Sequence, residues 1–152
     1  MSEGTARSAP IVDERVLVTA LHFALVWGEM DAFGHANNVA YFRWLESARM
    51  HHLRRIGITH PREQDGIGLL LAATTCRFLK PLTFPDDLTV RCGVGHVGTT
   101  SFTMQYRVES ARDGLAAEAE SVQVMFDYRN NAKTPIPDAI RRAIFALQAA
   151  EP

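Results

Sequence analysis

Residues 31–57 read DAFGHANNVAYFRWLESARMHHLRRIG and join a polar, glycine-containing loop to the longest helical pattern of the chain. From Asn38 to about Ile56, apolar residues recur at steps of three and four, or at sums of these steps, which is the spacing of one helix face. A helix that is apolar over more than half its circumference is expected to be largely wrapped by other structure. The predicted buried face comprises Val39, Phe42, Leu45, Leu53 and Ile56, widened by Tyr41, Trp44 and Ala48.

Both ends of this predicted helix carry the expected signals. Asn37 or Asn38 can cap the first turn, because an asparagine side chain accepts a hydrogen bond from a free helix N–H. Gly57 is a typical stop residue. His51 and His52 are adjacent, so their side chains diverge by about 100° and do not suit one metal ion. We interpret both histidines as solvated helix surface.

The remaining pattern is that of strands. Before the loop, Phe23, Leu25 and Trp27 alternate with their neighbours, and four more strand-like runs follow the helix. The sequence therefore predicts an α+β fold, with a five-stranded antiparallel sheet wrapped around the long central helix and a short C-terminal helix. The four later runs are residues 69–79, 88–94, 102–108 and 122–126, and the C-terminal helix spans residues 138–149.

The length of 152 residues suits one domain. We expect residues 1–15 to form a flexible N-terminal tail and residues 16–152 to form the single domain. The chain has 16 Lys and Arg against 17 Asp and Glu, a formal net charge of −1, which does not favour nucleic-acid or membrane-surface binding. No apolar run approaches the ~20 residues of a membrane helix, and the first residues lack a signal-peptide core. We expect a cytoplasmic protein.

The only two cysteines, Cys76 and Cys92, each lie in an apolar, strand-like run. Small buried hydrophobic residues in a reducing compartment are favoured over a disulfide, although the sequence alone does not say whether the two lie close together. No Cys or His spacing typical of a zinc site is present. We therefore expect no bound metal.

The loop before the helix places a carboxylate beside free backbone donors. The first N–H groups of a helix have no intrahelical acceptor, and the helix dipole makes that end electropositive. Asp31 lies just upstream and can reach the same small volume. Such a junction can stabilise an oxyanion and supply a general base or a nucleophile. In the alternative interpretation, Asp31 is a turn residue whose carboxylate caps a backbone N–H.

The segments DAFGHANNVAY, residues 31–41, and LESAR, residues 45–49, resemble the signature of the 4-hydroxybenzoyl-CoA thioesterase-like family of hotdog-fold acyl-CoA thioesterases. The strand order extends this resemblance over most of residues 20–130. It implies the hotdog fold and hydrolysis of an acyl-CoA to a free acid and CoA. It also implies Asp31 as general base or nucleophile, a choice that stays open, and the helix start as oxyanion hole.

The resemblance assigns roles to neighbouring residues. The backbone N–H of Asn38 would serve the oxyanion, while its side chain lacks the acid found at this position in some relatives. His35 would either touch the thioester or organise the loop, and the second role is favoured. Glu29 is interpreted as a solvated loop residue. Glu46 precedes Arg49 by three residues, which is typical of an ion pair on one helix face.

The phosphates of CoA need cations or free backbone donors. By resemblance, the turn of Gly98, Thr99, Thr100 and Ser101 would meet the coenzyme, although it can equally be an ordinary hairpin turn. Lys80 is a candidate phosphate partner. CoA would enter only as part of the substrate and product, so no resident cofactor is expected. Relatives pair their sheets, and exposed edge strands invite such pairing, so we expect a homodimer or homotetramer.

Two other functions fit parts of the sequence. A non-catalytic acyl-CoA-binding module is one, but such modules usually carry a DNA-binding domain, for which we expect no room in 152 residues. An acyl-ACP thioesterase is the other, but it needs a basic face that the net charge does not indicate. A hotdog dehydratase is disfavoured because no His-Phe-Pro-Gly-like segment is present. The sequence does not specify the acyl group.

Overall fold

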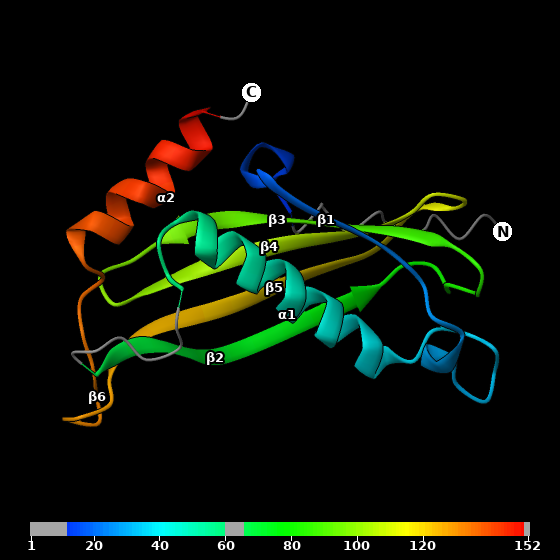
Figure 1. Cartoon of the computed structure of the whole chain (residues 1–152), viewed down its shortest axis with the longest axis horizontal. Coiled ribbons are helices and arrows are strands. Elements are labelled where there is room, and N and C mark those ends of the chain that lie inside the picture. The colour runs from blue at the N-terminus through cyan, green and yellow to red at the C-terminus, as the bar shows by residue number, and fades with distance from the viewer. Residues whose placement is uncertain (1–11, 60–65, 151–152) are drawn as a thin grey trace, which may run out of the picture.

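The computed structural model describes residues 12–59 and 66–150, and Figure 1 shows the arrangement of their elements. Within these ranges, two short 3₁₀ helices and two α-helices accompany six strands. In chain order the elements are η1 (Glu14–Val16), β1 (Thr19–Ala24), η2 (Trp27–Glu29), α1 (Asn38–Arg55), β2 (Ile67–Phe78), β3 (Asp87–Val97), β4 (Ser101–Ser110), β5 (Gly114–Asp127), β6 (Ala132–Lys133) and α2 (Asp138–Ala150).

The strands form one antiparallel sheet in the order β1-β3-β4-β5-β2, and β6 pairs with β5. Figure 1 shows α1 crossing one face of this sheet. The predicted hotdog architecture, with a five-stranded antiparallel sheet, a long central helix and a C-terminal helix, is confirmed. The strand β6 was not predicted, because two residues are too short to show an alternating pattern.

Alternating side chains give the sheet one apolar and one polar face. In β3 and β4 the residues that face α1 are almost completely buried: Leu88, Val90, Cys92, Val94, Phe102, Met104, Tyr106 and Val108. On the opposite face, Glu118 of β5 is only 3% exposed and pairs with Arg77 at 2.7 Å and Arg107 at 3.4 Å. Arg107 also pairs with Glu14 of η1. A row of opposite charges thus links three neighbouring strands and the N-terminal segment.

The helix α1 begins and ends where the sequence predicts. Asn37 is the N-cap, and its side chain accepts a hydrogen bond from the N–H of Val39 at 3.1 Å. Gly57 has φ +91°, which permits the stop. The prediction for Val39 is wrong, because its side chain is 61% exposed. The buried arc is displaced to one side of the predicted face, and its residues are Ala40, Tyr41, Trp44, Leu45, Ala48, Arg49, His52 and Leu53.

The first strand ends earlier than predicted. β1 stops at Ala24, and Trp27 lies in η2 with 73% of its side chain exposed. Alternation of apolar residues therefore continues past the end of the strand. Just beyond the last strand pair, Ala24 and Asp87, the N–H of Leu25 donates to the carbonyl of Asp86 at 2.9 Å.

The packed domain begins before the predicted boundary at residue 16. Val12 is buried, and the N–H of Asp13 donates to Gln105 Oε1 at 2.9 Å. A side chain at Gly93 would bring Cβ to 1.5 Å from the carbonyl oxygen of Val16, so only glycine allows this close approach. Residues 12–15 are thus part of the domain rather than of the predicted tail. The rest of that predicted tail, residues 1–11, lies outside the described residues.

The two cysteines are free thiols, as the sequence indicated. Cys92 lies opposite Tyr106, Tyr106 opposite Ala119, and Ala119 opposite Cys76. Three strand spacings separate the two cysteines, which amounts to about 14 Å. This distance is well beyond the reach of a disulfide.

The segment before α1 is anchored by Glu29. Its Oε1 accepts a hydrogen bond from Trp44 Nε1 at 3.0 Å, and its Oε2 accepts one from the N–H of Val26 at 3.0 Å. Its backbone carbonyl accepts the N–H of Asn37 at 2.8 Å. The interpretation of Glu29 as a solvated residue is therefore wrong. It joins the loop to the helix, because its partner Trp44 lies two helical turns inside α1.

Replacement of Glu29 by alanine should lower the free energy of unfolding by about 1–3 kcal/mol, because it leaves the indole N–H of Trp44 buried without an acceptor. Urea unfolding measures this change. Arg43 approaches the same carboxylate at 3.9 Å but is 70% exposed. The matched control Arg43→Ala should therefore change stability by less than about 0.5 kcal/mol. Equal losses in the two variants would contradict the anchoring role.

The interpretation of His52 as a solvated residue is also wrong, and its burial predicts a pH dependence. His52 is 1% exposed, its Nδ1 lies 2.7 Å from Thr19 Oγ1, and its Nε2 has no hydrogen-bond partner among the described residues. Burial, followed by the charges of Arg55 and His51, lowers the pKa of His52 to about 4. The unfolded chain therefore binds a proton more readily than the folded protein.

The free energy of unfolding should be fully retained above the ordinary histidine pKa of about 6.5 and should fall by up to about 3 kcal/mol as the pH drops toward 4. Urea unfolding at a series of pH values measures this fall. His52→Leu should flatten the profile over this range. The control His51→Gln, at the exposed neighbouring position, should keep the wild-type profile. A wild-type slope in His52→Leu would show that another group is responsible.

Candidate functional site

A cavity of ≈ 340 Å³, here called the Asp31 cavity, lies at the N-terminal end of α1. Three segments far apart in the sequence form it: the loop before α1, the first turn of α1, and the end of β2 with the residues that follow it. It is lined by Asp31, His35, Ala36, Asn38, Tyr41, Phe78, Leu79, Lys80 and Pro81. Four of the predicted site residues, Asp31, His35, Asn38 and Lys80, are therefore brought together.

The carboxylate of Asp31 is held by one of its two oxygens. Oδ1 accepts hydrogen bonds from the N–H of Phe33 at 2.8 Å and of His35 at 3.2 Å. The N–H of Asp31 donates in turn to the carbonyl of His35 at 2.7 Å. Within the described part of the chain, Oδ2 has no hydrogen-bond partner. Asp31 is thus a turn-capping residue through Oδ1, and its Oδ2 is left without a partner among these residues, at a residue that lines the cavity.

The first turn of α1 has a free backbone donor at a residue that lines this cavity. The N–H of Val39 donates to Asn37 Oδ1 at 3.1 Å, and the N–H of Ala40 donates to the Asn37 carbonyl at 2.9 Å. The N–H of Asn38 has no acceptor among residues 12–59 and 66–150, and Asn38 lines the cavity. The electropositive end of the helix therefore carries an unused donor close to the Asp31 carboxylate.

His35 and Lys80 contribute in different ways. The backbone of His35 holds the loop through its two bonds with Asp31, while its imidazole is exposed and lines the cavity. The backbone of His35 thus organises the loop, and its imidazole ring stays available to contact a ligand. Lys80 Nζ donates to the carbonyl of Asp113 at 2.6 Å. This bond places a cation at the cavity wall.

The wall opposite the loop is aromatic, and the sequence did not reveal it as part of the site. Tyr41 and Phe78 meet edge to face with ring centroids 4.8 Å apart. Burial, reinforced by the nearby Cys76, raises the pKa of Tyr41 to about 12, so its hydroxyl stays protonated at neutral pH. Tyr41 follows Asn38 by three residues, so helical spacing signalled their shared face. Phe78 gave no such local signal.

The predicted coenzyme turn lies at the other end of the sheet. Ser101 is opposite Val124, which is opposite Leu70, whereas Phe78 is eight residues further along β2. This separation amounts to about 27 Å of strand. The Gly98 carbonyl accepts a hydrogen bond from Arg141 Nη2 at 2.7 Å, so α2 covers part of the turn. Within one chain, Gly98, Thr99, Thr100 and Ser101 do not reach the Asp31 cavity.

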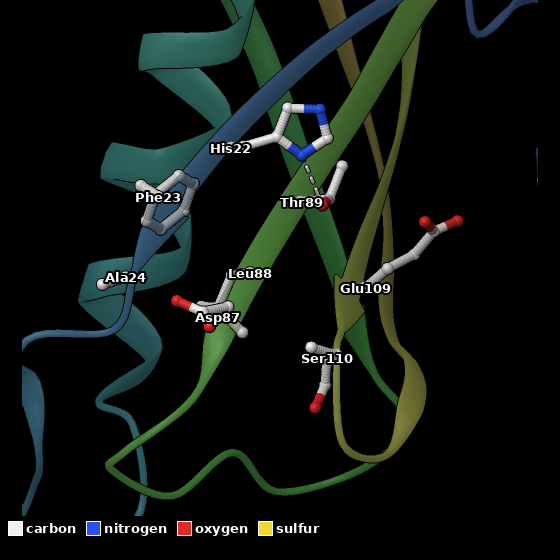
Figure 2. A pocket seen from close by; sticks show the side chains of 9 residues that line it. His22, Phe23, Ala24, Asp87, Leu88, Thr89, Glu109 and Ser110 are labelled. Carbon is white, nitrogen blue, oxygen red and sulfur yellow. Dashed lines mark hydrogen bonds between the residues drawn. The ribbon is translucent and has the colours of Figure 1, made fainter.

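A second hollow, of ≈ 460 Å³, lies on the polar face of the sheet (Figure 2). Figure 2 shows His22, Asp87 and Glu109 on three different strands, with the two carboxylates apart from each other. His22 Nδ1 lies 2.8 Å from Thr89 Oγ1, and Glu109 pairs with Arg91 at 3.7 Å. His22 and Glu109 thus already have side-chain partners, so the Asp31 cavity is the stronger candidate for chemistry.

Residues 12–59 and 66–150 contain no group of three or more His, Cys, Asp or Glu side chains arranged to hold a metal ion. None of the helices in these ranges is both long and apolar enough to cross a membrane.

Comparison with known proteins agrees with this geometry. The PA2801 protein of Pseudomonas aeruginosa is 32% identical, with a TM-score of 0.75 over 84% of this chain and 98% of that one. The BH1999 gentisyl-coenzyme A thioesterase is 26% identical, with a TM-score of 0.72 over 82% of this chain and 98% of that one. The Bacillus subtilis protein YsmA is 26% identical over 84 residues, 55% of this chain and 56% of YsmA.

The chain spans from 47% to 63% of the length of the curated relatives it matches. The family match is broader, because the sequence model of the thioesterase-like superfamily covers residues 25–144, from the end of β1 into α2. That range includes the Asp31 loop, α1 and all of β2 to β6. The chain therefore belongs to the thioesterase-like superfamily.

Proposed function

We propose that this protein hydrolyses an acyl-CoA thioester to a free acid and CoA. One observation carries the proposal: the free oxygen of Asp31 and the free N–H of Asn38 belong to residues that line the same cavity. Membership of the thioesterase-like superfamily supports hydrolysis of a thioester. Similarity to a gentisyl-coenzyme A thioesterase supports CoA as the thiol.

In this mechanism the thioester carbonyl oxygen accepts a hydrogen bond from the N–H of Asn38. This bond strengthens as negative charge develops on the oxygen, and the helix dipole adds to it. Asp31 Oδ2 then acts in one of two ways. As a general base it takes a proton from water while the water oxygen bonds to the carbonyl carbon. As a nucleophile it forms an anhydride that water hydrolyses. In both routes the C–S bond breaks and the thiolate takes up a proton.

The other residues of the cavity have supporting roles. In this proposal the His35 ring, from a residue that lines the cavity, donates to the thioester carbonyl or to the leaving sulfur. Lys80 is close enough to the cavity wall to attract a phosphate of CoA. Tyr41 and Phe78 exclude water from one side, which strengthens the interaction of Asn38 with the developing charge.

We also propose that two copies assemble through β2. This strand is an edge of the sheet among the described residues, with Leu70, Leu71, Phe78 and Leu79 each 42% to 46% exposed. An apolar, unpaired edge is a template for pairing. In an antiparallel pair, the Leu70 end of one copy lies toward the Phe78 end of the other. The turn of Gly98 to Ser101 would then lie toward the Asp31 cavity of the second copy. A tetramer and a cytoplasmic location stay predictions.

Asp31→Asn should lower kcat by about 10²–10⁴-fold, because the amide can neither accept the proton nor attack the carbonyl. Release of free CoA, measured with a thiol reagent, gives the rate. CoA binding, measured by calorimetry, should change little. The control Asp113→Asn alters an exposed carboxylate but keeps the backbone carbonyl that holds Lys80, and it should retain activity.

Near-normal turnover by Asp31→Asn would overturn the assignment of Asp31. Binding of acyl-CoAs by the wild type without any release of thiol would favour the non-catalytic binding module. Activity only on acyl groups attached to acyl-carrier protein would favour the alternative acyl-ACP thioesterase.

The assembly proposal predicts a dimer in sedimentation equilibrium. Leu70→Lys should shift the protein to monomer, because a lysine on an edge strand opposes edge-to-edge pairing. Phe145→Lys is the matched control, because Phe145 is 54% exposed on α2, away from this edge. A monomeric wild type, or a monomeric control with a dimeric Leu70→Lys, would contradict pairing through β2.

A further inference from the structure

The second half of α1 carries a buried cation without an anion. Arg49 is 7% exposed, and its only hydrogen bond in the described part of the chain runs from Nη1 to the hydroxyl of Tyr106 at 3.4 Å. The predicted ion pair with Glu46 is not formed among these residues, and no described carboxylate lies within ion-pair distance of Arg49. A guanidinium has five N–H donors, and buried charges in proteins are normally paired. Arg49 is thus an exception that calls for a ligand.

The hydrogen-bond network that Arg49 joins is neutral, and Glu46 is the carboxylate among the residues that line its hollow. Burial raises the pKa of Tyr106 above its usual range, so at neutral pH this partner is a phenol and not a phenolate. The hydroxyl of Tyr106 lies 2.6 Å from Ser121 Oγ, which accepts a hydrogen bond from Gln123 Nε2 at 2.8 Å. The network contributes a phenol, a hydroxyl and an amide. None of them neutralises the guanidinium.

Arg49 lines a hollow between α1 and the strands β2 and β5. This Arg49 hollow has a volume of ≈ 210 Å³, roughly that of seven water molecules. Its polar floor consists of the buried side chains of Arg49 and Gln123, and Glu46 is exposed at its rim. Its walls are apolar and consist of Met50, Leu53, Ile58, Leu69 and Leu71. The hollow suits a small apolar body that ends in an anion.

We propose that the Arg49 hollow binds the acyl group of the substrate and selects a short or single-ring acyl group whose far end is a carboxylate. This inference rests on the proposed function. The carboxylate accepts two parallel hydrogen bonds from the guanidinium, a geometry that arginine favours. The apolar part of the acyl group fills the walls. The volume of the hollow, ≈ 210 Å³, favours a short acyl group over a long fatty acyl chain.

The position of the hollow relative to the Asp31 cavity requires the second copy. Along one helix, Asn38 and Arg49 are eleven residues apart, about 16 Å, which a short acyl group cannot span. Antiparallel pairing of two β2 strands places the second half of one α1 toward the first half of the other. The acyl group of a thioester bound in the Asp31 cavity of one copy then extends into the Arg49 hollow of its partner.

The test compares pairs of CoA thioesters that differ only at the far end of the acyl group. The thioesters with a terminal carboxylate are succinyl-, glutaryl- and adipyl-CoA, and 4-carboxybenzoyl-CoA, which contains a ring. Each is compared with the otherwise identical thioester that carries an isopropyl group in place of the carboxylate. For at least one pair, the wild type should prefer the carboxylate by about 10–100-fold in kcat/KM, the effect of hydrogen bonds to a charged group. Preference for the isopropyl partner, or none, in every pair would overturn the proposal.

Variants locate the selectivity in Arg49. Arg49→Met keeps a similar volume without charge, so it should lose the preference for the carboxylate while hydrolysing the isopropyl thioester at least as well as the wild type. Arg54→Met, at an exposed position on α1, should behave as the wild type. A folded Arg49→Met, checked by circular dichroism, that still prefers the carboxylate would contradict the role of Arg49.

A binding measurement separates failure of this inference from failure of the proposed function. Calorimetry on Asp31→Asn compares the affinities of the same pairs of thioesters without turnover. Tighter binding of the carboxylate member supports the Arg49 hollow even if no thioester is hydrolysed. Equal affinities together with measurable hydrolysis by the wild type would reject the inference and leave the thioesterase proposal intact.

Discussion

The packing of α1 against one face of the sheet is the constraint on which the rest of this structure depends. Leu45 and Ala48 of α1 are fully buried, as are Val90 and Met104 on the facing strands. Removal of this apolar surface from water holds the helix against the sheet. Because the helix is packed there, its first turn is held at one place. That placement positions the N–H of Asn38, which is free because it lies in the first turn of the helix.

The loop that carries Asp31 is positioned by polar contacts rather than by apolar burial. Glu29 joins it to Trp44 inside α1, and the N–H of Ala36 donates to the carbonyl of the fully buried Leu82 at 2.8 Å. These bonds hold the loop against two different parts of the domain. The carboxylate of Asp31 is then oriented by the loop's own N–H groups. A mobile loop would lose this orientation, because each bond depends on the others being formed.

Buried charged side chains on the two faces of the sheet differ in the partners they have. On the face away from α1, the buried carboxylate of Glu118 has two arginine partners, so its charge is balanced within the chain. On the face toward α1, the buried Arg49 has a neutral phenol as its only hydrogen-bond partner among the described residues. This contrast is the physical ground for assigning Arg49 to a ligand. The two ends of the helix would thus share the work of the proposed enzyme, the first turn for chemistry and the second half for recognition.

Local patterns in the sequence determined the long helix with its caps at Asn37 and Gly57, the run of antiparallel strands, and the candidate pair of Asp31 and Asn38. Each of these rests on residues close together in the chain, where spacing and capping act directly. Only the tertiary structure decided that Lys80 joins Asp31 while the Gly98 turn does not. Strand register sets that difference, and eight residues of β2 are enough to separate them.

Burial of single side chains was likewise decided in three dimensions. Val39 fits the apolar spacing yet is exposed, whereas Glu29, Arg49 and His52 are polar yet largely buried. Apolar residues at steps of three and four show which face of a helix is buried. They locate the centre of that face only to within one residue position. That centre depends on the strands that α1 meets, and those strands are far away in the sequence. The roles of Glu29 and Arg49 follow from these distant contacts alone.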